Sequence, residues 1–354
     1  MTDARLHMSV LSRSAYVRSD EGRFLSAIRE AFPHLEASPR PEASSRPETP
    51  AERGAPPRSD TASLPAFGNS DTPRTLAYRY TVDRKSDLFV DSLGTPIAHS
   101  QDFNLYHWKK SFVVSAGVRS FAQCFWEDAR VEVTVHPDDR EDDWVVAHRL
   151  FFLPLLEWMR REGYYPLHAS GFEVAGKTIL VSGPSGSGKS TSSLAALAAG
   201  APFLTDDTLF VSRDREGKLV LNPFPEPIKI GRESARWFPR WREDFVERHG
   251  KFSLPDSRLP GGGRMANCSP GLLLFPSFSR EKVTRFEPMA RPEAMVRLLP
   301  QSAIPSTSDV LQSHMDLLGD FVEASDPYFF RFAEDVPDLM THLDRLVRSK
   351  ERSN

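Results

Sequence analysis

Short segments of the chain alternate apolar and polar residues with a period of two, which is typical of strands buried on one face. Two such strands are predicted, at residues 76–82 and 129–135, and the segments 111–115 and 120–125 between them are predicted to form two more strands. Apolar residues then recur at helical spacing over residues 143–161, and Pro154 inside this pattern is expected to kink or restart the helix. We therefore predict a β-rich N-terminal lobe over residues 76–166, closed by this helix.

An amphipathic helix is predicted within the first 36 residues. Over residues 20–35, apolar side chains are spaced by three and four, with charges between them; they are Phe24, Leu25, Ile28, Phe32 and Leu35. We favour docking of this helix on the protein's own body, and binding of a partner is the alternative.

Residues 37–75 are rich in Pro, Ser, Arg, Glu and Gly and poor in apolar residues. Such a composition cannot bury enough surface to offset its ordering entropy, so this segment is predicted to be a disordered linker.

The remaining residues, 167–350, predict an α/β domain. It opens with a hairpin whose strands are expected at residues 169–174 and 178–182. Further apolar strands are predicted at residues 272–275 and 283–286, and helices at 292–299, 308–319 and 335–348. Strands that alternate with helices in this way favour a sheet covered by helices on its faces.

Composition narrows the class of protein. The 354 residues include 45 Lys and Arg against 48 Asp and Glu, a net charge of −3, so we expect no nucleic-acid partner. Cys124 and Cys268 cannot form a disulfide framework and suit a reducing compartment. No apolar run reaches about 18 residues, and the first residues lead into no apolar signal core. We therefore expect a cytoplasmic protein with no membrane partner. A homo-oligomer is compatible with the sequence, which has no signal for the oligomeric state.

The segment that follows the second hairpin strand is a candidate phosphate-binding loop. Residues 183–190 read Gly-Pro-Ser-Gly-Ser-Gly-Lys-Ser and match the pattern G-x-x-x-x-G-K-[ST]. The glycines let backbone N–H groups point at phosphate oxygens, and the helix expected at 190–199 adds its positive dipole end. Lys189 can reach the β- and γ-phosphates, and the Ser190 hydroxyl can ligate Mg²⁺. The candidate nucleotide-binding residues are Gly183, Pro184, Ser185, Gly186, Ser187, Gly188, Lys189, Ser190 and Thr191.

Asp206 and Asp207 follow a short strand expected at residues 203–205. A right-handed crossover from the loop would make this strand parallel to the one at 178–182, with the acidic pair near the loop. One carboxylate can then hold Mg²⁺ while the other takes the proton of an attacking hydroxyl. A polar junction between strand and loop is the alternative. For His168, spacing leaves the role open, because the hairpin turn separates it from the loop strand along the chain.

Three short motifs together carry a resemblance to a known family. Leu-His-Ala-Ser at 167–170, the phosphate loop, and Leu-Thr-Asp-Asp at 204–207 resemble the bacterial HPr kinase/phosphorylase family and its relatives, which include kinases of lasso-peptide precursors. The resemblance is specific over about residues 163–210. It implies a P-loop kinase fold akin to phosphoenolpyruvate carboxykinase, with ATP and Mg²⁺ as cofactors. It also implies that Lys189 and Ser190 bind phosphate and Mg²⁺, that Asp207 accepts the proton of a substrate serine, and that His168 supports it.

One signature of that family is missing. HPr kinases continue with Glu-Ile-Arg-Gly-Leu-Gly, which supplies a further Mg²⁺ ligand and part of the phosphorylase machinery, whereas residues 223–232 here read Pro-Phe-Pro-Glu-Pro-Ile-Lys-Ile-Gly-Arg. The reverse phosphorolysis reaction and HPr as the substrate are therefore not predicted, and the chain looks more like the single-direction kinase relatives. Glu226 is the candidate stand-in for the missing metal ligand.

Two basic segments are further candidates for contact with a phosphoryl group or with an acidic partner. A run of three glycines precedes Arg264 and is expected to form a mobile loop that can swing this arginine over a transferring phosphoryl group; a plain flexible connection is the alternative. Arg232, Arg236 and Arg240 recur every four residues beside two tryptophans. We favour a solvated helix face here over a face that grips an acidic peptide or nucleic acid.

The sequence thus predicts an ATP- and Mg²⁺-dependent kinase that acts on a hydroxyl, with a serine of a peptide or small protein as the expected acceptor. Two alternatives stay open. The first is a nucleotide-dependent binding or regulatory module with slow ATPase activity. The second is a kinase of a free small molecule such as serine.

Overall fold

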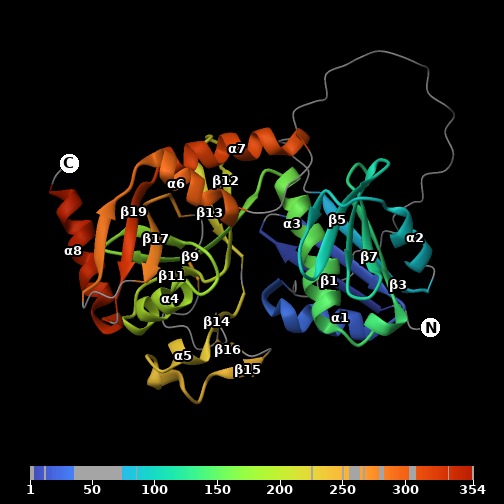
Figure 1. Ribbon diagram of the computed structural model, residues 1–354, viewed down its shortest axis with the longest axis horizontal. Coiled ribbons are helices and arrows are strands. Elements are labelled where there is room, and N and C mark those ends of the chain that lie inside the picture. The colour runs from blue at the N-terminus through green and yellow to red at the C-terminus, as the bar shows by residue number, and fades with distance from the viewer. Residues whose placement is uncertain are drawn as a thin grey trace, which may run out of the picture.

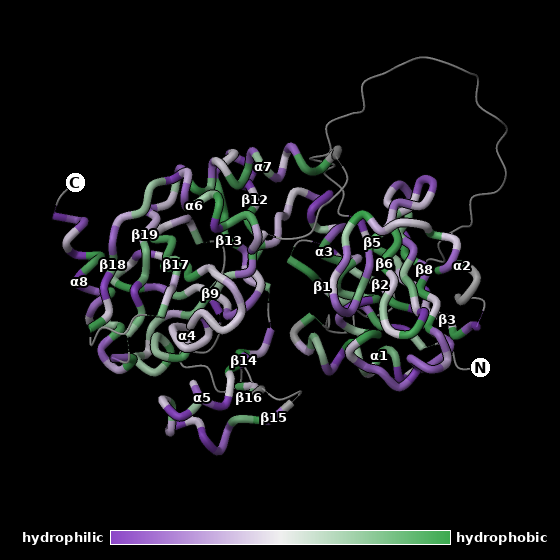
Figure 2. The backbone as a smooth tube through the Cα atoms, viewed as in Figure 1, coloured by the Kyte–Doolittle hydropathy of each residue, from purple (hydrophilic) through white to green (hydrophobic). Residues whose placement is uncertain are grey.

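The computed structural model places the chain in two lobes that lie side by side (Figure 1). It describes residues 4–11, 13–35, 74–84, 86–224, 226–248, 251–254, 264–265, 268–278, 283–302, 308–333 and 335–352. In each lobe the apolar segments lie on the strands and on the helix faces that cover them (Figure 2). No helix among these residues has the length and apolar character needed to cross a bilayer.

The N-terminal lobe is built on an eight-stranded sheet with the order β1-β2-β3-β8-β7-β6-β5-β4. Its strands are β1 Ala4–Val10, β2 Arg13–Ser19, β3 Thr75–Val82, β4 Ala98–His99, β5 Phe103–Trp108, β6 Ser111–Ala116, β7 Ser120–Phe125 and β8 Arg130–Val135. The four strands predicted for this lobe are confirmed as β3, β6, β7 and β8. A short helix, α2 (Ser86–Ser92), lies near β7.

Residues before the predicted linker form part of this same lobe. Helix α1 (Gly22–Ala31) confirms the helix expected over residues 20–35, and it packs on the protein's own body, where Phe24 and Ile28 are fully buried. The sequence did not predict β1 and β2, which add two strands to the edge of the sheet, with β2 parallel to β3. The segment predicted as a disordered linker, residues 37–75, lies outside the described residues as far as residue 73.

The helix that closes the N-terminal lobe changes its winding along its length. Residues Val145–Phe151 form a π-helical stretch, and helix α3 continues over Phe152–Arg161. Pro154 is the third residue of α3, just after the winding changes, and the chain remains helical across it. A restart of the helix is not seen, and the predicted kink at Pro154 stays a prediction.

The C-terminal lobe has three layers, with a sheet between two pairs of helices. The sheet order is β13-β12-β9-β10-β17-β19-β18, and β11 pairs with β9 beside β12. The strands are β9 Tyr165–Val174, β10 Lys177–Ser182, β11 Phe203–Thr205, β12 Thr208–Arg213, β13 Leu219–Pro223, β17 Leu272–Phe278, β18 Arg285–Pro288 and β19 Asp326–Phe332. Helices α4 (Lys189–Ala198) and α8 (Leu339–Glu351) bury their apolar sides on one face. Helices α6 (Arg291–Leu298) and α7 (Ser308–Glu323) cover the other face. The fold class is thus α/β.

A third, small sheet of β14 (Ile228–Ile230), β16 (Lys251–Leu254) and β15 (Val246–Arg248) lies beside α4.

The helix face of arginines expected over residues 232–240 is not formed, because α5 ends after four residues, at Arg232–Ala235. Arg236 and Arg240 instead lie over the rings of the tryptophans that follow them, 5.4 and 4.8 Å from the ring centroids. Arg240 also donates to the carbonyl of Ala198, at the carboxyl end of α4. Pro239 starts a separate 3₁₀ turn, which breaks the helical repeat.

The two lobes meet through a cluster of aromatic rings. Phe224, which follows β13, is fully buried, and its ring lies 5.9 Å from that of Phe32 and 5.1 Å from that of Phe152 in the N-terminal lobe. A buried ion pair between Arg160 and Glu157 lies on α3, and Arg160 also donates to the carbonyl of Ser302, at 3.4 Å. The aromatic contacts tie the segment just before Glu226 to the N-terminal lobe, and the bond from Arg160 ties α3 to Ser302.

Candidate functional site

The predicted phosphate loop runs from the end of β10 to the start of α4. Its backbone needs glycine at two points, because Gly186 has φ 79° and Gly188 has φ 106°. At Gly188 a Cβ atom would also lie 3.4 Å from the ring of Phe332. The curled loop therefore opens directly onto the N-terminus of a ten-residue helix, the arrangement that binds anions through free N–H groups.

Two side chains inside the loop are placed to receive an anion. The Lys189 ammonium is almost fully buried and donates to the loop's own carbonyls, to Gly183 at 2.7 Å and to Pro184 at 3.0 Å. The Ser187 hydroxyl is buried and has no hydrogen-bond partner among the described residues. A buried hydroxyl without a partner is unfavourable, and a phosphate oxygen in the loop would accept from it. The positive charge of Lys189 and the unpaired hydroxyl of Ser187 both fit a bound phosphate group.

His168 lies beside the start of this loop. In the β9–β10 hairpin, Ser182 is paired with Ala169, and the Ser182 hydroxyl donates to the carbonyl of His168 at 3.2 Å. Spacing along the chain left the role of His168 open, because the turn separates it from the loop strand. The structure brings the two together, because an antiparallel hairpin places the residues farthest from its turn side by side.

Asp206 and Asp207 lie at the break between β11 and β12. Both strands run antiparallel to β9, so β11 has the direction of β10, as predicted, but β9 lies between them. The Thr205 hydroxyl donates to the carbonyl of Thr208 across the break, at 2.9 Å, and the Ala169 N–H donates to the carbonyl of Asp207, also at 2.9 Å. These bonds hold the acidic pair against the strand that carries His168.

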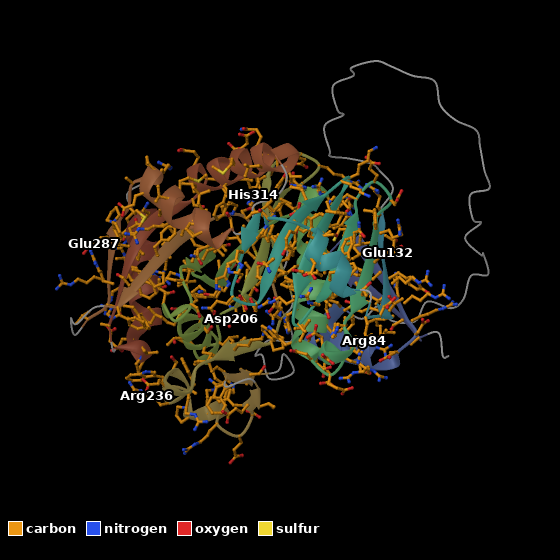
Figure 3. All side chains as sticks on the ribbon, turned by 45° about the vertical axis from the view of Figure 1, so that its right-hand side comes forward. Arg84, Glu132, Asp206, Arg236, Glu287 and His314 are labelled. Carbon is orange, nitrogen blue, oxygen red and sulfur yellow. The ribbon has the colours of Figure 1, made fainter. Side chains whose placement is uncertain are left out.

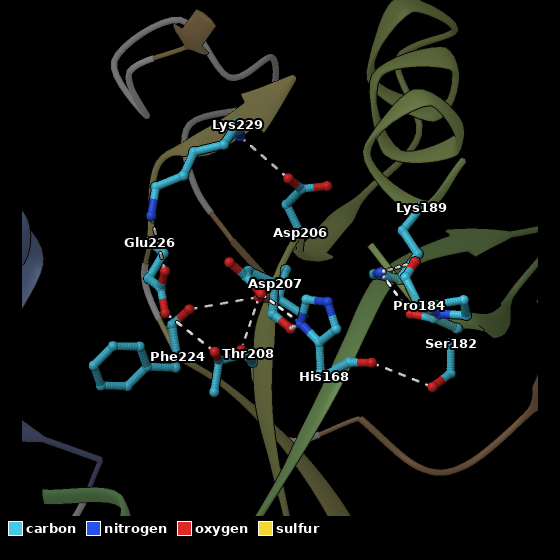
Figure 4. Close-up of polar contacts among 12 residues, drawn as sticks. His168, Ser182, Pro184, Lys189, Asp206, Asp207, Thr208, Phe224, Glu226 and Lys229 are labelled. Carbon is cyan, nitrogen blue, oxygen red and sulfur yellow. Dashed lines mark hydrogen bonds and ion pairs between the residues drawn. The ribbon is translucent and has the colours of Figure 1, made fainter. Parts of the chain in front are cut away.

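The Asp207 carboxylate is an ionised acceptor with a histidine partner. Its Oδ1 atom lies 2.5 Å from Nδ1 of His168 (Figure 4). Burial acts to raise the pKa of Asp207, but the hydrogen bond and charge of His168, with the charges of Lys229 and Lys189, hold this pKa at about 2. Both side chains remain partly open to solvent, with 39% of His168 and 34% of Asp207 exposed. A substrate group can therefore reach them.

Asp206 is the buried member of the pair. Its Oδ2 atom accepts from the Lys229 N–H at 3.2 Å, and its Oδ1 atom has no hydrogen-bond partner among the described residues. Burial, followed by the charge of Asp207, raises the pKa of Asp206 to about 6, and the nearby hydroxyls of Ser190 and Ser193 limit this rise. A buried carboxylate oxygen without a donor is the kind of atom that a cation stabilises.

These residues fit a magnesium ion of the kind that accompanies a nucleotide. Mg²⁺ is usually held by one or two carboxylates together with phosphate oxygens and waters, and it needs no cage made of protein alone. Accordingly, no group of three His, Cys, Asp or Glu side chains among the described residues is arranged to hold a metal. The orphan Oδ1 atom of Asp206, with the Ser190 hydroxyl beside it, would supply the protein's ligands.

Glu226 lies in the same cluster, but it already has partners. Its Oε1 atom accepts from the Thr208 hydroxyl at 3.1 Å, and its Oε2 atom lies 3.4 Å from the Lys229 ammonium. Burial and then the charge of Asp207 raise the pKa of Glu226 to about 7, against the effects of Lys229 and Thr208. Its predicted role as a metal ligand stays a prediction.

Sequence reasoning did not single out Lys229, which contacts both Asp206 and Glu226 and lowers the pKa of Asp207. Lys229 lies between two buried isoleucines on β14. At such a position in a strand, a lysine is as often an ordinary surface residue as part of a site. The only available signal was its position in the stretch that replaces the family's signature.

Arg264 reaches the edge of the cluster. Its guanidinium donates to the backbone carbonyl of Glu226 and lies over the ring of Phe203, 5.0 Å from the centroid. The three glycines before it lie outside the described residues. In this position Arg264 holds the backbone of Glu226, and its predicted contact with a transferring phosphoryl group stays a prediction.

Comparison with known proteins gives a distant fold likeness only. No family model and no curated protein matches the sequence. Among solved structures, the chain is similar to the HPr(Ser) kinase/phosphatase from Coxiella burnetii, with 14% sequence identity and a TM-score of 0.29. This likeness covers 53% of the present chain and 98% of the other chain. Because the TM-score is low, we base the functional proposal on the site itself.

Proposed function

We propose that this chain is a phosphotransferase that moves the γ-phosphoryl group of ATP, with Mg²⁺, to a hydroxyl group. One observation carries the proposal. A phosphate loop and an ionised carboxylate bonded to histidine meet at the same end of the β9–β10 hairpin (Figure 4). Phosphoryl transfer needs little more from a protein than positioned phosphates, neutralised charge and an oriented acceptor hydroxyl.

The loop supplies the positioning of the nucleotide. Lys189 would exchange its two backbone carbonyl partners for oxygens of the β- and γ-phosphates, and the orphan Ser187 hydroxyl would donate to a third oxygen. The N–H groups at the start of α4 would add their donors and the positive end of the helix dipole. The curl of the loop backbone is already formed, and binding would change the partners of Lys189.

The residues that would hold Mg²⁺ are Ser190 and Asp206. Bound there with the nucleotide, the ion neutralises charge on the phosphate oxygens during transfer. Asp206 lies next to Asp207 in the chain, so the cation site and the proton acceptor are fixed to each other by one peptide unit.

Asp207 would orient the acceptor hydroxyl and take its proton. A bond forms between the hydroxyl oxygen and the γ-phosphorus, the bond from that phosphorus to the bridging oxygen breaks, ADP leaves, and the proton passes to Asp207. A carboxylate with a pKa near 2 is a weak base, so the proton moves late, when the attacking oxygen is already bonded to phosphorus. His168 holds the carboxylate in place through its Nδ1 contact.

The acceptor we propose is a serine of a peptide or small protein. The resemblance over about residues 163–210 supports this class, and the side chains of Asp207 and His168 are partly open to solvent, so an acceptor group can approach them. The test is incubation of the protein with γ-labelled ATP, Mg²⁺, candidate peptides and a cell lysate, with Asp207→Asn as the matched control. Label on a peptide or protein supports the proposal. Label on a metabolite indicates a small-molecule kinase, and release of free phosphate alone indicates a nucleotide-driven regulatory module.

A further inference from the structure

An exposed phenylalanine stands at the end of the strand next to the phosphate loop. Phe278 is the last residue of β17, and 69% of its surface is open to solvent. Its ring lies 5.9 Å from that of Phe332, which is paired with it on β19 and is itself buried. The buried ring of Phe332 thus contacts one side of the Phe278 ring, and the other side of the Phe278 ring is open to solvent.

Of the two rings, that of Phe332 borders the loop. Strand β17 runs parallel to β10 with Leu274 beside Val181, so Pro276 lies next to Gly183, where a Cβ atom would come within 3.5 Å of the proline ring. Phe332, on β19 beyond β17, lies 3.4 Å from the position of a Cβ atom on Gly188. Phe278 is two residues beyond Pro276 along the strand, about 7 Å farther out.

The proposed reaction fixes the direction in which a nucleotide would lie. In the sheet, β9 and β17 flank β10 on opposite sides. The acidic pair belongs to the β9 side, whereas Glu287 on β18 marks the opposite edge of the sheet (Figure 3). If the γ-phosphorus faces Asp207, the other end of the nucleotide leaves the loop on the β17–β19 side, where Phe278 is exposed.

We infer that Phe278 is the stacking platform for the nucleobase. The inference rests on the proposed function, because the acidic pair sets the orientation of the triphosphate. An aromatic ring stacks on the face of any base, so this contact strengthens nucleotide binding without selecting between adenine and guanine. A flat ring held by a second buried ring is also ordered before the ligand arrives, which lowers the entropic cost of the contact.

The experiment compares ligands with and without a base on the full-length protein. Calorimetric titrations with ATP, GTP and inorganic tripolyphosphate, each with Mg²⁺, are run on the parent chain and on the variants Phe278→Ala and Phe278→Trp. The matched control is Val296→Ala on α6, which removes an equally exposed apolar side chain from the opposite face of the sheet. Because Phe278 is exposed, its replacement leaves the core intact.

We expect Phe278→Ala to raise the Kd of ATP and GTP about tenfold or more, about 1.4 kcal/mol, with no change for tripolyphosphate. Phe278→Trp should retain the affinity for both nucleotides. The inference is overturned if Phe278→Ala changes ATP binding no more than Val296→Ala does, or if it weakens tripolyphosphate equally. A parent chain that binds ATP no more tightly than tripolyphosphate also overturns it but leaves the loop assignment intact. A parent chain that binds none of the three contradicts the proposed function as well.

Discussion

We expect the replacement of Asp207 with asparagine to separate nucleotide binding from phosphoryl transfer. The side chain keeps its size, and its amide oxygen can still accept a hydrogen bond from Nδ1 of His168, now 2.5 Å from the carboxylate. What is lost is the negative charge and the ability to take a proton at an accessible pH. Because 34% of the side chain is exposed and the backbone bonds around it remain, we expect the variant to fold normally.

The expected effects on kcat and on ATP affinity have opposite signs. Loss of a positioned proton acceptor costs about 10²–10⁴ in rate, which corresponds to about 3–5 kcal/mol in the transition state. ATP affinity should be unchanged or higher, because Asp207 is absent from the loop's hydrogen bonds and its charge repels phosphate. The loss of that charge also removes one of the causes, after burial, that raise the pKa of Asp206 and Glu226.

The assay measures kcat with the acceptor found by labelling, and the Kd of ATP by calorimetry, for the parent chain and Asp207→Asn. Glu216→Gln is a matched control, since it removes an exposed carboxylate from the turn between β12 and β13. A variant with normal kcat would refute the assignment of Asp207. So would a Kd for ATP that rises in proportion to the loss in kcat, because the residue would then act through binding.

Three further changes test the loop, the cation site and the lobe junction. Lys189→Ala should raise the Kd of ATP about tenfold or more in calorimetry, because a charge-assisted contact with the phosphates is lost; unchanged affinity would contradict the role of Lys189. Asp206→Asn should raise the Mg²⁺ concentration at half-maximal transfer while ATP binding without Mg²⁺ stays the same, and an unaltered Mg²⁺ titration would exclude Asp206 as a ligand. Phe224→Ala should lower the free energy of unfolding of the chain by about 3–5 kcal/mol in denaturant titrations, whereas exposed Val118→Ala should leave it unchanged; equal effects would contradict the packing described for the junction.

The turn from β10 into α4 could be predicted because its information is local. A loop that binds phosphate needs glycines at fixed positions and a lysine at the start of a helix, and all of these lie within eight consecutive residues, 183–190. The acidic pair followed from the loop, since a helix and a short strand return the chain to the same region. The α/β class and the helix near the N-terminus could also be predicted from periodicity alone.

The contacts that depend on pairing between distant strands could not be predicted. Leu6, Met8 and Val10 alternate and are buried, but their strand reaches the sheet through β2, whose parallel partner β3 begins more than fifty residues later. The position of β19 between β17 and β18 likewise depends on register and not on local composition. Lys229 joins the cluster only because β14 passes beside Asp206, and no local pattern encodes that approach.

The most direct test of the account is a crystal structure of the protein with Mg²⁺ and a non-hydrolysable ATP analogue. We predict the triphosphate in the loop of residues 183–190, with the cation between Ser190 and Asp206 and the γ-phosphorus facing the Asp207 carboxylate. A triphosphate bound elsewhere, or a terminal phosphate turned away from Asp207 toward β17, would contradict it.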